Sequence, residues 1–437
     1  MSARESWQSR AGFIAAAVGS AVGLGNIWRF PYEAASNGGA AFLVVNFVLI
    51  LLVGLPAMLV EFSIGRRAHR NIVDAYGKGG KIWRFAGVFG LLTGFWILSY
   101  YSVVAGWVIR YLVGSATGAY FGDPAAYFGT VSAGLDALLL HALFVVLVVG
   151  IVSLGIKRGI ELATKLMVPT IGILMVLLAI YAATLPGGGA GYEFFLQPDF
   201  ETLVANIGTI LPAALGEVLF TLSLGMGAMI TYASYVDSDE SLVTDGVVIV
   251  FANTAVGYLA GLIVFPLLFA EGVSPGEAGP GAIFISVATA FQALPAGNVL
   301  GVVFYFVVLI AALSSGISLL EVVVSYFVDN YDVTRPKVAA GIGLGIFLLG
   351  VPSALDTNTL TLFDSVASKL LLPIGISLAT VFVGWVYGRE AATELGRGTR
   401  DRLSQVWLWH VRTVVLVAVL VTLTISVAEF IGISIPL

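Results

Sequence analysis

The chain consists of long apolar runs separated by shorter polar connections. By the rule that a bilayer span needs about 20 mostly apolar residues, about eleven runs qualify. They lie at residues 11–36, 41–65, 86–115, 136–155, 162–184, 206–235, 242–270, 298–328, 337–355, 360–387 and 409–434. An outer-membrane barrel would show short alternating strands, and these runs do not alternate. The pattern therefore predicts an all-α polytopic membrane protein with about eleven transmembrane helices.

Small and polar residues interrupt the middle of the first run. They are Gly19, Ser20, Gly23, Gly25 and Asn26. Glycine breaks the regularity of a helix, and unwound backbone at membrane depth is tolerated only where it lines a cavity or the protein interior. We therefore expect a helix that stops near Ser20 and restarts near Leu24. Its freed carbonyls could bind a cation, and the N–H groups at the restart could bind an anion.

A second interruption of the same kind lies in the sixth run. Between Phe220 and Tyr235 it contains Thr221, Ser223, Gly225 and Gly227. The first and sixth runs are each the first of a set of five runs. Because five is an odd number, the second set starts from the opposite side of the membrane and is inverted relative to the first. Matching broken helices in inverted halves indicate a transport site at the middle of the membrane. The alternative for either break is a small-residue contact between packed helices.

This organisation predicts one transporter domain over residues 1–437. Residues 11–184 form the first inverted repeat, residues 206–387 the second, and residues 409–434 a final helix. The repeat rests on topology, because no clear sequence identity relates the two halves.

The composition agrees with a membrane protein. Only 11% of the residues are charged and 59% are hydrophobic, against about 25% charged residues in a typical soluble domain. The chain has no cysteine, and its three histidines are too far apart in sequence for metal-ligand spacing. The net charge of −5 does not indicate a nucleic-acid partner. No nucleophile–base constellation is apparent, so we expect neither an enzyme nor an organic cofactor.

Lysine and arginine give the orientation. They concentrate in the even-numbered connections, which the positive-inside rule places in the cytoplasm. We therefore expect a protein of the cell membrane with a cytoplasmic N-terminus and, after an odd number of spans, an extracellular C-terminus. The acidic connection at 236–245 falls on the cytoplasmic side as well, but acidic residues contribute little to the rule. The oligomeric state is not indicated.

Two stretches carry a family resemblance. AVGLGNIWRFPY, from Ala21 to Tyr32, and FTLSLGMGAMITYASY, from Phe220 to Tyr235, resemble the signatures of the neurotransmitter:sodium symporter family. The resemblance covers essentially the whole chain, and Met226 and the span number are most similar to the prokaryotic hydrophobic amino-acid transporters. It implies a 5+5 inverted repeat and sodium-coupled symport of hydrophobic or aromatic L-amino acids by alternating access.

The resemblance implies two sodium sites. The first would use the Ala21 carbonyl, Asn26, Thr221 and Asn253, with the substrate carboxylate completing the shell. The second would use the carbonyls of Gly19, Val22 and Ala311 and the hydroxyls of Ser314 and Ser315. Oxygen ligands of this kind suit a hard cation. The SSGIS stretch that contains both serines could instead be a small-residue helix contact.

The resemblance also implies a substrate site. Its residues would be Ala21, Leu24, Gly25, Ile97, Tyr101, Phe220, Thr221, Ser223, Met226, Ser315 and Leu319. The substrate carboxylate would meet the N–H groups of Leu24 and Gly25 and the hydroxyl of Tyr101. The amino group would meet the carbonyls of Ala21, Phe220 and Thr221, with Ser223 close by. The biogenic-amine branch has an aspartate where this chain has Gly23, which favours an amino acid over an amine.

Two gates follow from the same resemblance. The outer gate would be Arg29 with Asp364, covered by Phe220, and the inner gate Arg4 with Asp329, near Trp7, Ser234 and Tyr235. The alternative for each pair is a surface salt bridge worth about 0–1 kcal/mol.

Glu217 departs from the family pattern. It lies one helical turn before Thr221, where chloride-dependent members have a neutral residue, and Gly257 occupies the position at which the leucine transporter has an acid. We expect Glu217 to supply the negative charge itself, so that transport does not require chloride. A protonated structural glutamate is the alternative. For the whole chain, the alternatives are a proton-coupled porter of the same architecture and a substrate-sensing receptor or channel.

Overall fold

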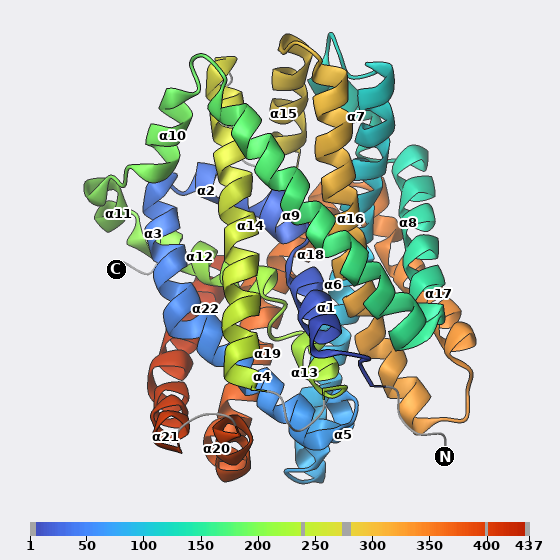
Figure 1. The fold of residues 1–437 in the computed structure, drawn as a ribbon, viewed down its shortest axis with the longest axis vertical. Helices are drawn as coiled ribbons and strands as arrows, with labels where there is room; N and C mark the ends of the chain where they lie inside the picture. Colours follow the sequence, from blue (N-terminus) through green and yellow to red (C-terminus); the bar gives the residue numbers. More distant parts are fainter. Residues whose placement is uncertain (1–5, 237–240, 273–280, 398–400, 433–437) are drawn as a thin grey trace.

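The computed structural model describes residues 6–236, 241–272, 281–397 and 401–432. In these ranges the fold is all-helical, without a strand, which confirms the predicted class. Most long helices run along the long axis of the molecule (Figure 1). Short helices close its two ends, with α7, α10 and α15 at the top of the view and α5 and α20 at the bottom.

The first half of the chain contains α1 to α11. Their bounds are α1 Arg10–Ala21, α2 Phe30–Ser36, α3 Ala40–Leu49, α4 Leu55–Ala68, α5 Ile72–Gly77, α6 Arg84–Thr117, α7 Pro124–Val131, α8 Leu135–Ser153, α9 Glu161–Ala183, α10 Gly189–Leu196 and α11 Phe200–Ala205. Three π-helical turns, η1 Gly25–Arg29, η2 Ile50–Gly54 and η4 Ile156–Ile160, and one 3₁₀ turn, η3 Lys81–Trp83, connect them.

The second half contains α12 to α22. Their bounds are α12 Ile207–Thr221, α13 Ala228–Ala233, α14 Leu242–Ala270, α15 Ala282–Ala293, α16 Gly297–Asn330, α17 Arg335–Leu355, α18 Thr357–Val366, α19 Leu372–Val381, α20 Gly388–Gly396, α21 Asp401–His410 and α22 Leu416–Phe430. The π-helical turns η5 Ala367–Leu371 and η7 Val411–Val415 join consecutive helices into longer spans, and η6 Phe382–Val386 ends the span that contains α18 and α19.

Ten of the eleven predicted runs have a matching span in the described part of the chain. Nine helical segments are long and apolar enough to cross a membrane, and α1 with η1–α2 forms a tenth that bends by 44° at its break. The sixth run is divided between α12 and α13, and α12 is too short to span on its own. The count of eleven therefore stays a prediction.

The broken helices lie inside the bundle. α1 packs against α9, α14 and α16, and α13 packs against α4 (Figure 1). Eight residues of α1, from Gly12 to Ala21, are buried around its whole circumference. The small residues on α1, such as Gly12, Ala16 and Gly19, let neighbouring helices approach its backbone closely, which suits this central position.

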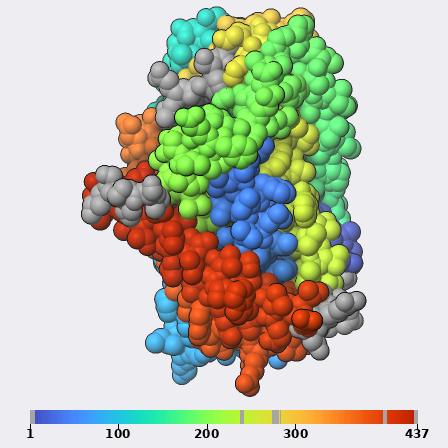
Figure 2. Space-filling model, turned by 90° about the vertical axis from the view of Figure 1, so that its left-hand side faces the viewer, coloured from blue at the N-terminus to red at the C-terminus, as the bar shows by residue number. Residues whose placement is uncertain are grey.

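The outer faces of the bundle are apolar. Figure 2 shows the face on which α3 and α4, in blue, lie between α10–α11, in green, and the C-terminal helices, in red. Exposed apolar side chains on α3, η2 and α22 include Phe47, Leu51, Val417 and Leu420. Large outward-facing apolar surfaces of this kind suit contact with lipid rather than water.

Candidate functional site

The first break begins where the sequence predicts it. α1 ends at Ala21 and η1 starts at Gly25, one residue after each predicted position. Val22 is extended, with φ −78° and ψ 99°, so its carbonyl leaves the helical ladder. The side-chain oxygen of Asn26 accepts the N–H of Gly23 at 3.1 Å and replaces a lost backbone partner.

The second break has three residues with positive φ. They are Ser223 at 53°, Gly225 at 81° and Gly227 at 81°. Glycine takes this conformation without strain, and Ser223 is held in it by a hydrogen bond from its hydroxyl to the carbonyl of Ser20 at 2.9 Å. The N–H of Gly225 donates to Glu61 at 2.6 Å. The two breaks are therefore in direct contact.

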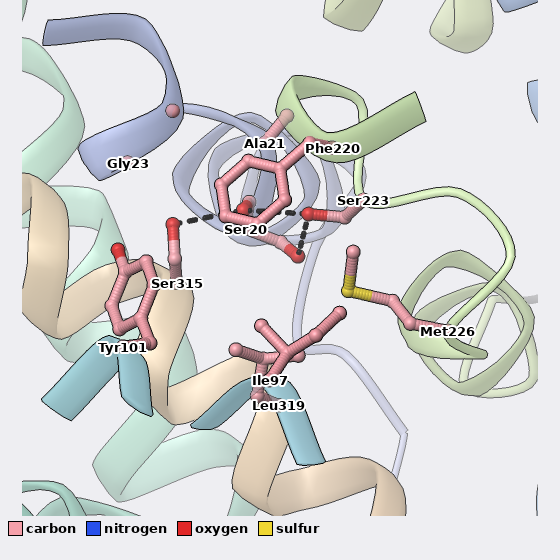
Figure 3. A pocket seen from close by; sticks show the side chains of 11 residues that line it. Ser20, Ala21, Gly23, Ile97, Tyr101, Phe220, Ser223, Met226, Ser315 and Leu319 are labelled. Atoms are coloured by element: carbon pink, nitrogen blue, oxygen red, sulfur yellow. Dashed lines mark hydrogen bonds between the residues drawn. The ribbon is translucent and has the colours of Figure 1, made fainter. Parts of the chain in front are cut away.

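A small buried cavity lies between the two breaks (Figure 3). Its lining contains nine predicted substrate residues: Ala21, Gly25, Ile97, Tyr101, Phe220, Ser223, Met226, Ser315 and Leu319. Ser20 and Gly23 also line it, although the substrate site predicted from the sequence did not include them. Their position inside the predicted break could have indicated that they face the site. Leu24 and Thr221 are not in the lining, although the N–H of Leu24 donates to the Tyr101 hydroxyl at 3.2 Å.

The cavity has one apolar and one polar side. Ile97, Met226 and Leu319 gather on one side in Figure 3, and the hydroxyls of Ser223 and Ser315 approach the first break on the other. The arrangement can hold a small molecule with a polar head and an apolar side chain.

Gly23 faces this cavity with no room for a side chain. A Cβ there would overlap the Ser315 hydroxyl and lie 2.9 Å from the Tyr101 hydroxyl. The aspartate of the amine branch would therefore not fit without displacing these groups.

The four residues predicted for the first sodium site come together beside the cavity. The amide of Asn26 donates to the backbone carbonyl of Asn253 at 3.0 Å and to its side chain at 2.8 Å. One terminal atom of the Asn253 amide lies 3.1 Å from the Ala21 carbonyl oxygen and 3.2 Å from that of Thr221. If this atom is the amide oxygen, it forms a group of three oxygens with the two carbonyls, and such a group suits a cation. If the amide is turned so that this atom is the nitrogen, it donates hydrogen bonds to both carbonyls.

The five residues predicted for the second sodium site also come together. The Ser314 hydroxyl lies 3.3 Å from the Val22 carbonyl and 2.9 Å from the Ala311 carbonyl. The Ser315 hydroxyl lies 3.4 Å from the Gly19 carbonyl. α16 thus places two hydroxyls against the backbone that the first break frees.

These clusters contain neutral oxygen atoms. Across the described ranges, no group of three or more histidine, aspartate and glutamate side chains could hold a metal ion. Carbonyl, hydroxyl and amide oxygens favour a hard cation over a transition metal.

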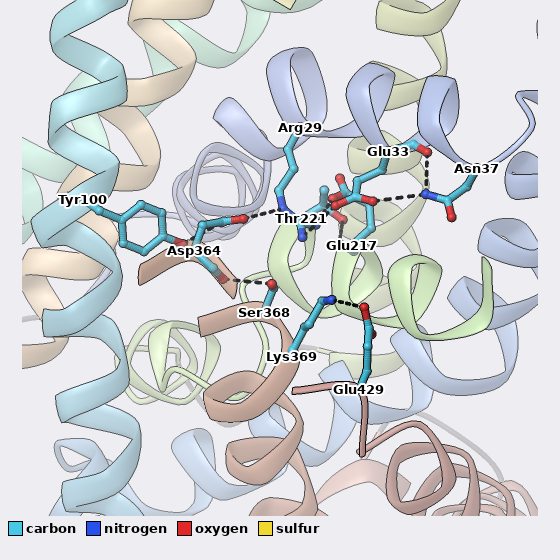
Figure 4. A network of polar contacts seen from close by, with 10 residues as sticks. All are labelled: Arg29, Glu33, Asn37, Tyr100, Glu217, Thr221, Asp364, Ser368, Lys369 and Glu429. Carbon is cyan, nitrogen blue, oxygen red and sulfur yellow. Dashed lines mark hydrogen bonds and ion pairs between the residues drawn. The ribbon is translucent and has the colours of Figure 1, made fainter. Parts of the chain in front are cut away.

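Arg29 lies at the outer side of the cavity, and three carboxylates contact it (Figure 4). The predicted partner Asp364 is 3.6 Å away, whereas Glu217 is 2.5 Å away and Glu33 is 2.9 Å away. The guanidinium carbon also lies 5.4 Å from the centre of the Phe220 ring. Glu33 was not predicted, although its i,i+4 spacing from Arg29 was a usable signal.

A second cavity, of about 300 Å³, lies beyond Arg29. Arg29, Glu33 and Asp364 line its floor, and the Lys369–Glu429 ion pair, at 2.7 Å, lines it as well. The Arg29 cluster thus separates a large outer cavity from the small inner one.

The opposite side of the inner cavity is closed by aromatic and carboxylate groups. Trp7 donates from its indole to the Tyr232 carbonyl at 3.0 Å, and the Tyr235 hydroxyl donates to Glu321 at 2.8 Å. Asp329 accepts the N–H of Asn71 at 3.0 Å. Glu321, which also binds Arg335 at 2.6 Å, was not predicted. The hydroxyl of Ser234 donates to the Thr231 carbonyl.

Some residues named from the sequence fall elsewhere. Arg4 of the predicted inner gate lies outside the described residues, as do Asp237, Asp239 and Glu240 of the acidic connection.

Known proteins are similar to this chain over most of its length. The chain matches the family described as "Sodium:neurotransmitter symporter family" over residues 4–121 and 129–434. It is 34% identical to YhdH of Bacillus subtilis, described as an uncharacterised sodium-dependent transporter, over 95% of this chain and 96% of that protein. It is 26% identical to the sodium-dependent dopamine transporter of Bos taurus, over 98% and 69% of the two chains.

A solved structure is similar over nearly the whole fold. The crystal structure of MhsT in complex with L-phenylalanine superposes with a TM-score of 0.90 and 39% sequence identity. The match covers 97% of this chain and all of that one.

Proposed function

The chain belongs to the sodium:neurotransmitter symporter family, and on this premise we propose that it couples sodium entry to the uptake of hydrophobic and aromatic L-amino acids. The observation that carries the proposal is the closed cavity between the two breaks, with polar groups on one side and Ile97, Met226 and Leu319 on the other. The bound L-phenylalanine of MhsT, a protein 39% identical to this chain, supports the same substrate class.

The proposed substrate pose is the one that the family resemblance implies. The carboxylate meets the N–H groups of Leu24 and Gly25 at the restart of the helix, where backbone donors favour an anion. The ammonium meets the carbonyls of Ala21, Phe220 and Thr221. The side chain meets Met226, whose flexible thioether adapts to several shapes.

Two sodium ions are proposed to bind at the oxygen clusters. The first lies between the Ala21 carbonyl and the amides of Asn26 and Asn253, where the substrate carboxylate completes its shell. The second lies between α1 and the hydroxyls of Ser314 and Ser315. Because the first ion and the substrate share a contact, each should raise the affinity for the other by the same factor.

The two sides of the cavity provide alternating access. Sodium and substrate enter through the outer cavity when Arg29 and Asp364 separate, and they leave on the side of Trp7 and Tyr235. Each sodium ion releases about 2.3 kcal/mol at 100 mV and about 1.4 kcal/mol from a tenfold gradient. Two ions supply about 7 kcal/mol, enough to concentrate substrate about 10⁵-fold.

Transport is proposed to be independent of chloride. Glu217 is fully buried one turn before Thr221, and its Oε1 has no hydrogen-bond partner among the described residues. An ionised carboxylate there would supply the negative charge that chloride supplies in other members.

Uptake into proteoliposomes tests the proposal. Labelled phenylalanine and leucine should accumulate under an inward sodium gradient, equally with chloride and with gluconate, and should not accumulate with potassium. Binding without accumulation would favour a sensor. Accumulation that follows a proton gradient and ignores sodium would contradict the sodium sites.

A further inference from the structure

Arg29 is shared unequally among its three carboxylates. Its two terminal nitrogens bind Glu217 at 2.5 Å and Glu33 at 2.9 Å, and only the Nε edge faces Asp364, at 3.6 Å. That separation is longer than a good hydrogen bond, and Nε has no hydrogen-bond partner among the described residues. The planar guanidinium donates in a fixed fork, so a fork aimed at Glu33 and Glu217 cannot also grip Asp364 bidentately.

The three carboxylates belong to different parts of the fold. Glu33 is on α2 and Glu217 is on α12, so both lie on the outer halves of the broken helices, together with Arg29. Asp364 is on α18, and its other oxygen accepts the Tyr100 hydroxyl of α6 at 3.0 Å. The Arg29–Asp364 contact is an ion pair that joins the broken helices to this second part (Figure 4).

The three carboxylates compete for the guanidinium of Arg29, and burial strengthens their attraction to it. Arg29 is 5% exposed and Glu217 is 0% exposed, so neither charge is well screened by water. Asn37 approaches Glu33 at 3.4 Å, which helps to keep that carboxylate beside Arg29.

We propose that Glu217 and Glu33 hold Arg29 back from Asp364, so that they set how readily the outer gate opens. Removing either negative charge frees the guanidinium to turn toward Asp364 and strengthens the closed gate. Glu217 is then a positioning residue that acts through Arg29. The inference rests on the proposed alternating access, but it does not depend on the chloride role of Glu217.

A cysteine reporter below the gate tests the inference. The chain has no cysteine of its own, so Ile97→Cys introduces a single thiol, at a side chain that is now 1% exposed in the inner cavity. A membrane-impermeant thiol reagent is applied from outside to right-side-out vesicles in sodium without substrate. The labelling rate then reports opening of the outer gate.

Four variants are compared in this background. Glu217→Gln and Glu33→Gln should each lower the labelling rate, by about fivefold if the Arg29–Asp364 bond gains about 1 kcal/mol. Asp364→Asn should raise the rate. Glu429→Gln, a carboxylate in the same outer cavity that binds Lys369, should leave it unchanged.

The double variant Glu217→Gln/Asp364→Asn separates gating from a structural effect. If Glu217 acts through Arg29 and Asp364, adding Glu217→Gln to Asp364→Asn should change nothing. A further fall in labelling in the double variant would overturn the inference. If Glu217→Gln does not fold, the double variant Glu33→Gln/Asp364→Asn provides the same test.

The labelling rates of the single variants also separate failure of the inference from failure of the gate assignment. If Asp364→Asn raises labelling while Glu217→Gln and Glu33→Gln label like the parent, the inference fails and the gate assignment stands. If Asp364→Asn also has no effect, the assignment of the outer gate itself is wrong.

Discussion

The side-chain amide of Asn26 donates to the side chain of Asn253 at 2.8 Å, although the two residues are 227 positions apart. This bond fixes the first broken helix to α14 beside the carbonyls of Ala21 and Thr221. It thereby assembles the first proposed sodium site from both halves of the chain.

Asn253→Ala should weaken sodium binding. Loss of a ligand that interacts with a charge costs about 1.5–3 kcal/mol, so the sodium concentration for half-maximal phenylalanine binding should rise about 10- to 150-fold. Equilibrium binding at varied sodium measures this. Asn298→Ala, which removes an amide that donates to the Ser115 carbonyl, is the control and should bind like the parent. Equal sodium dependence in both variants would exclude Asn253 as a ligand.

Ser315→Ala should impair the second sodium site. We expect sodium-driven uptake to need about tenfold more sodium, because one hydroxyl ligand near the Gly19 carbonyl is lost. Ser325→Ala lies on the same helix, where the hydroxyl donates to the Val322 carbonyl, and should leave sodium dependence unchanged. Because Ser315 also lines the substrate cavity, phenylalanine affinity at saturating sodium must be measured beside it. If Ser315→Ala changes the phenylalanine affinity but not the sodium dependence, Ser315 belongs to the substrate site alone.

Gly23→Ala should weaken amino-acid binding. A methyl group would overlap the Ser315 hydroxyl, and overpacking of this kind costs about 1–3 kcal/mol, which lowers affinity about 5- to 150-fold. Gly172→Ala on α9 has open space around its Cβ and serves as the control. Isothermal titration with phenylalanine compares the two. Unchanged affinity in Gly23→Ala would mean that the substrate does not approach this part of the break.

Leu319→Ala should shift selectivity toward larger side chains. Shortening one wall of the apolar side enlarges the cavity, and a pocket distinguishes a methylene by about 1–3 kcal/mol. Competition against labelled phenylalanine should show tryptophan gaining on leucine by about tenfold. Leu348→Ala, at a side chain 59% exposed on α17, should keep the parent ranking. If the ranking of Leu319→Ala is also unchanged, the apolar part of the substrate lies elsewhere.

Glu217→Gln should make uptake depend on chloride. The parent should transport equally in chloride and gluconate, whereas the variant should need chloride to replace the lost charge. Initial uptake rates in the two anions measure this, with Glu429→Gln as the matched control. A variant that transports equally well in both anions would remove the charge role of Glu217 without affecting the gating inference.

The breaks were predictable because their causes are local. The predicted positions of the first break, Ser20 and Leu24, are each within one residue of the observed ones. Glycine and polar side chains within an apolar run indicate an unwound segment whatever the rest of the chain contacts. The division of the sixth run at Thr221 follows the same rule. The family resemblance then supplied which carbonyls and hydroxyls would meet.

The partners of Arg29 were only partly predictable. Asp364 came from the resemblance, and Glu33 has a local spacing that could have been used. The approach of Glu217 depends on how α12 packs beside η1, which no local pattern reports. Glu321 was missed for the same reason, because its partner Tyr235 lies in the turn after α13 and its partner Arg335 lies at the start of α17.

The sequence by itself determined the apolar spans, the two breaks and the family, because span length, glycine content and signature motifs are properties of consecutive residues. Only the tertiary structure decided that the breaks face each other across a closed cavity and that Arg29 prefers Glu217 over Asp364. Such choices depend on distances of a few ångströms between helices far apart in the chain. Packing fixes those distances, and the electrostatic energy of a buried charge pair depends strongly on them.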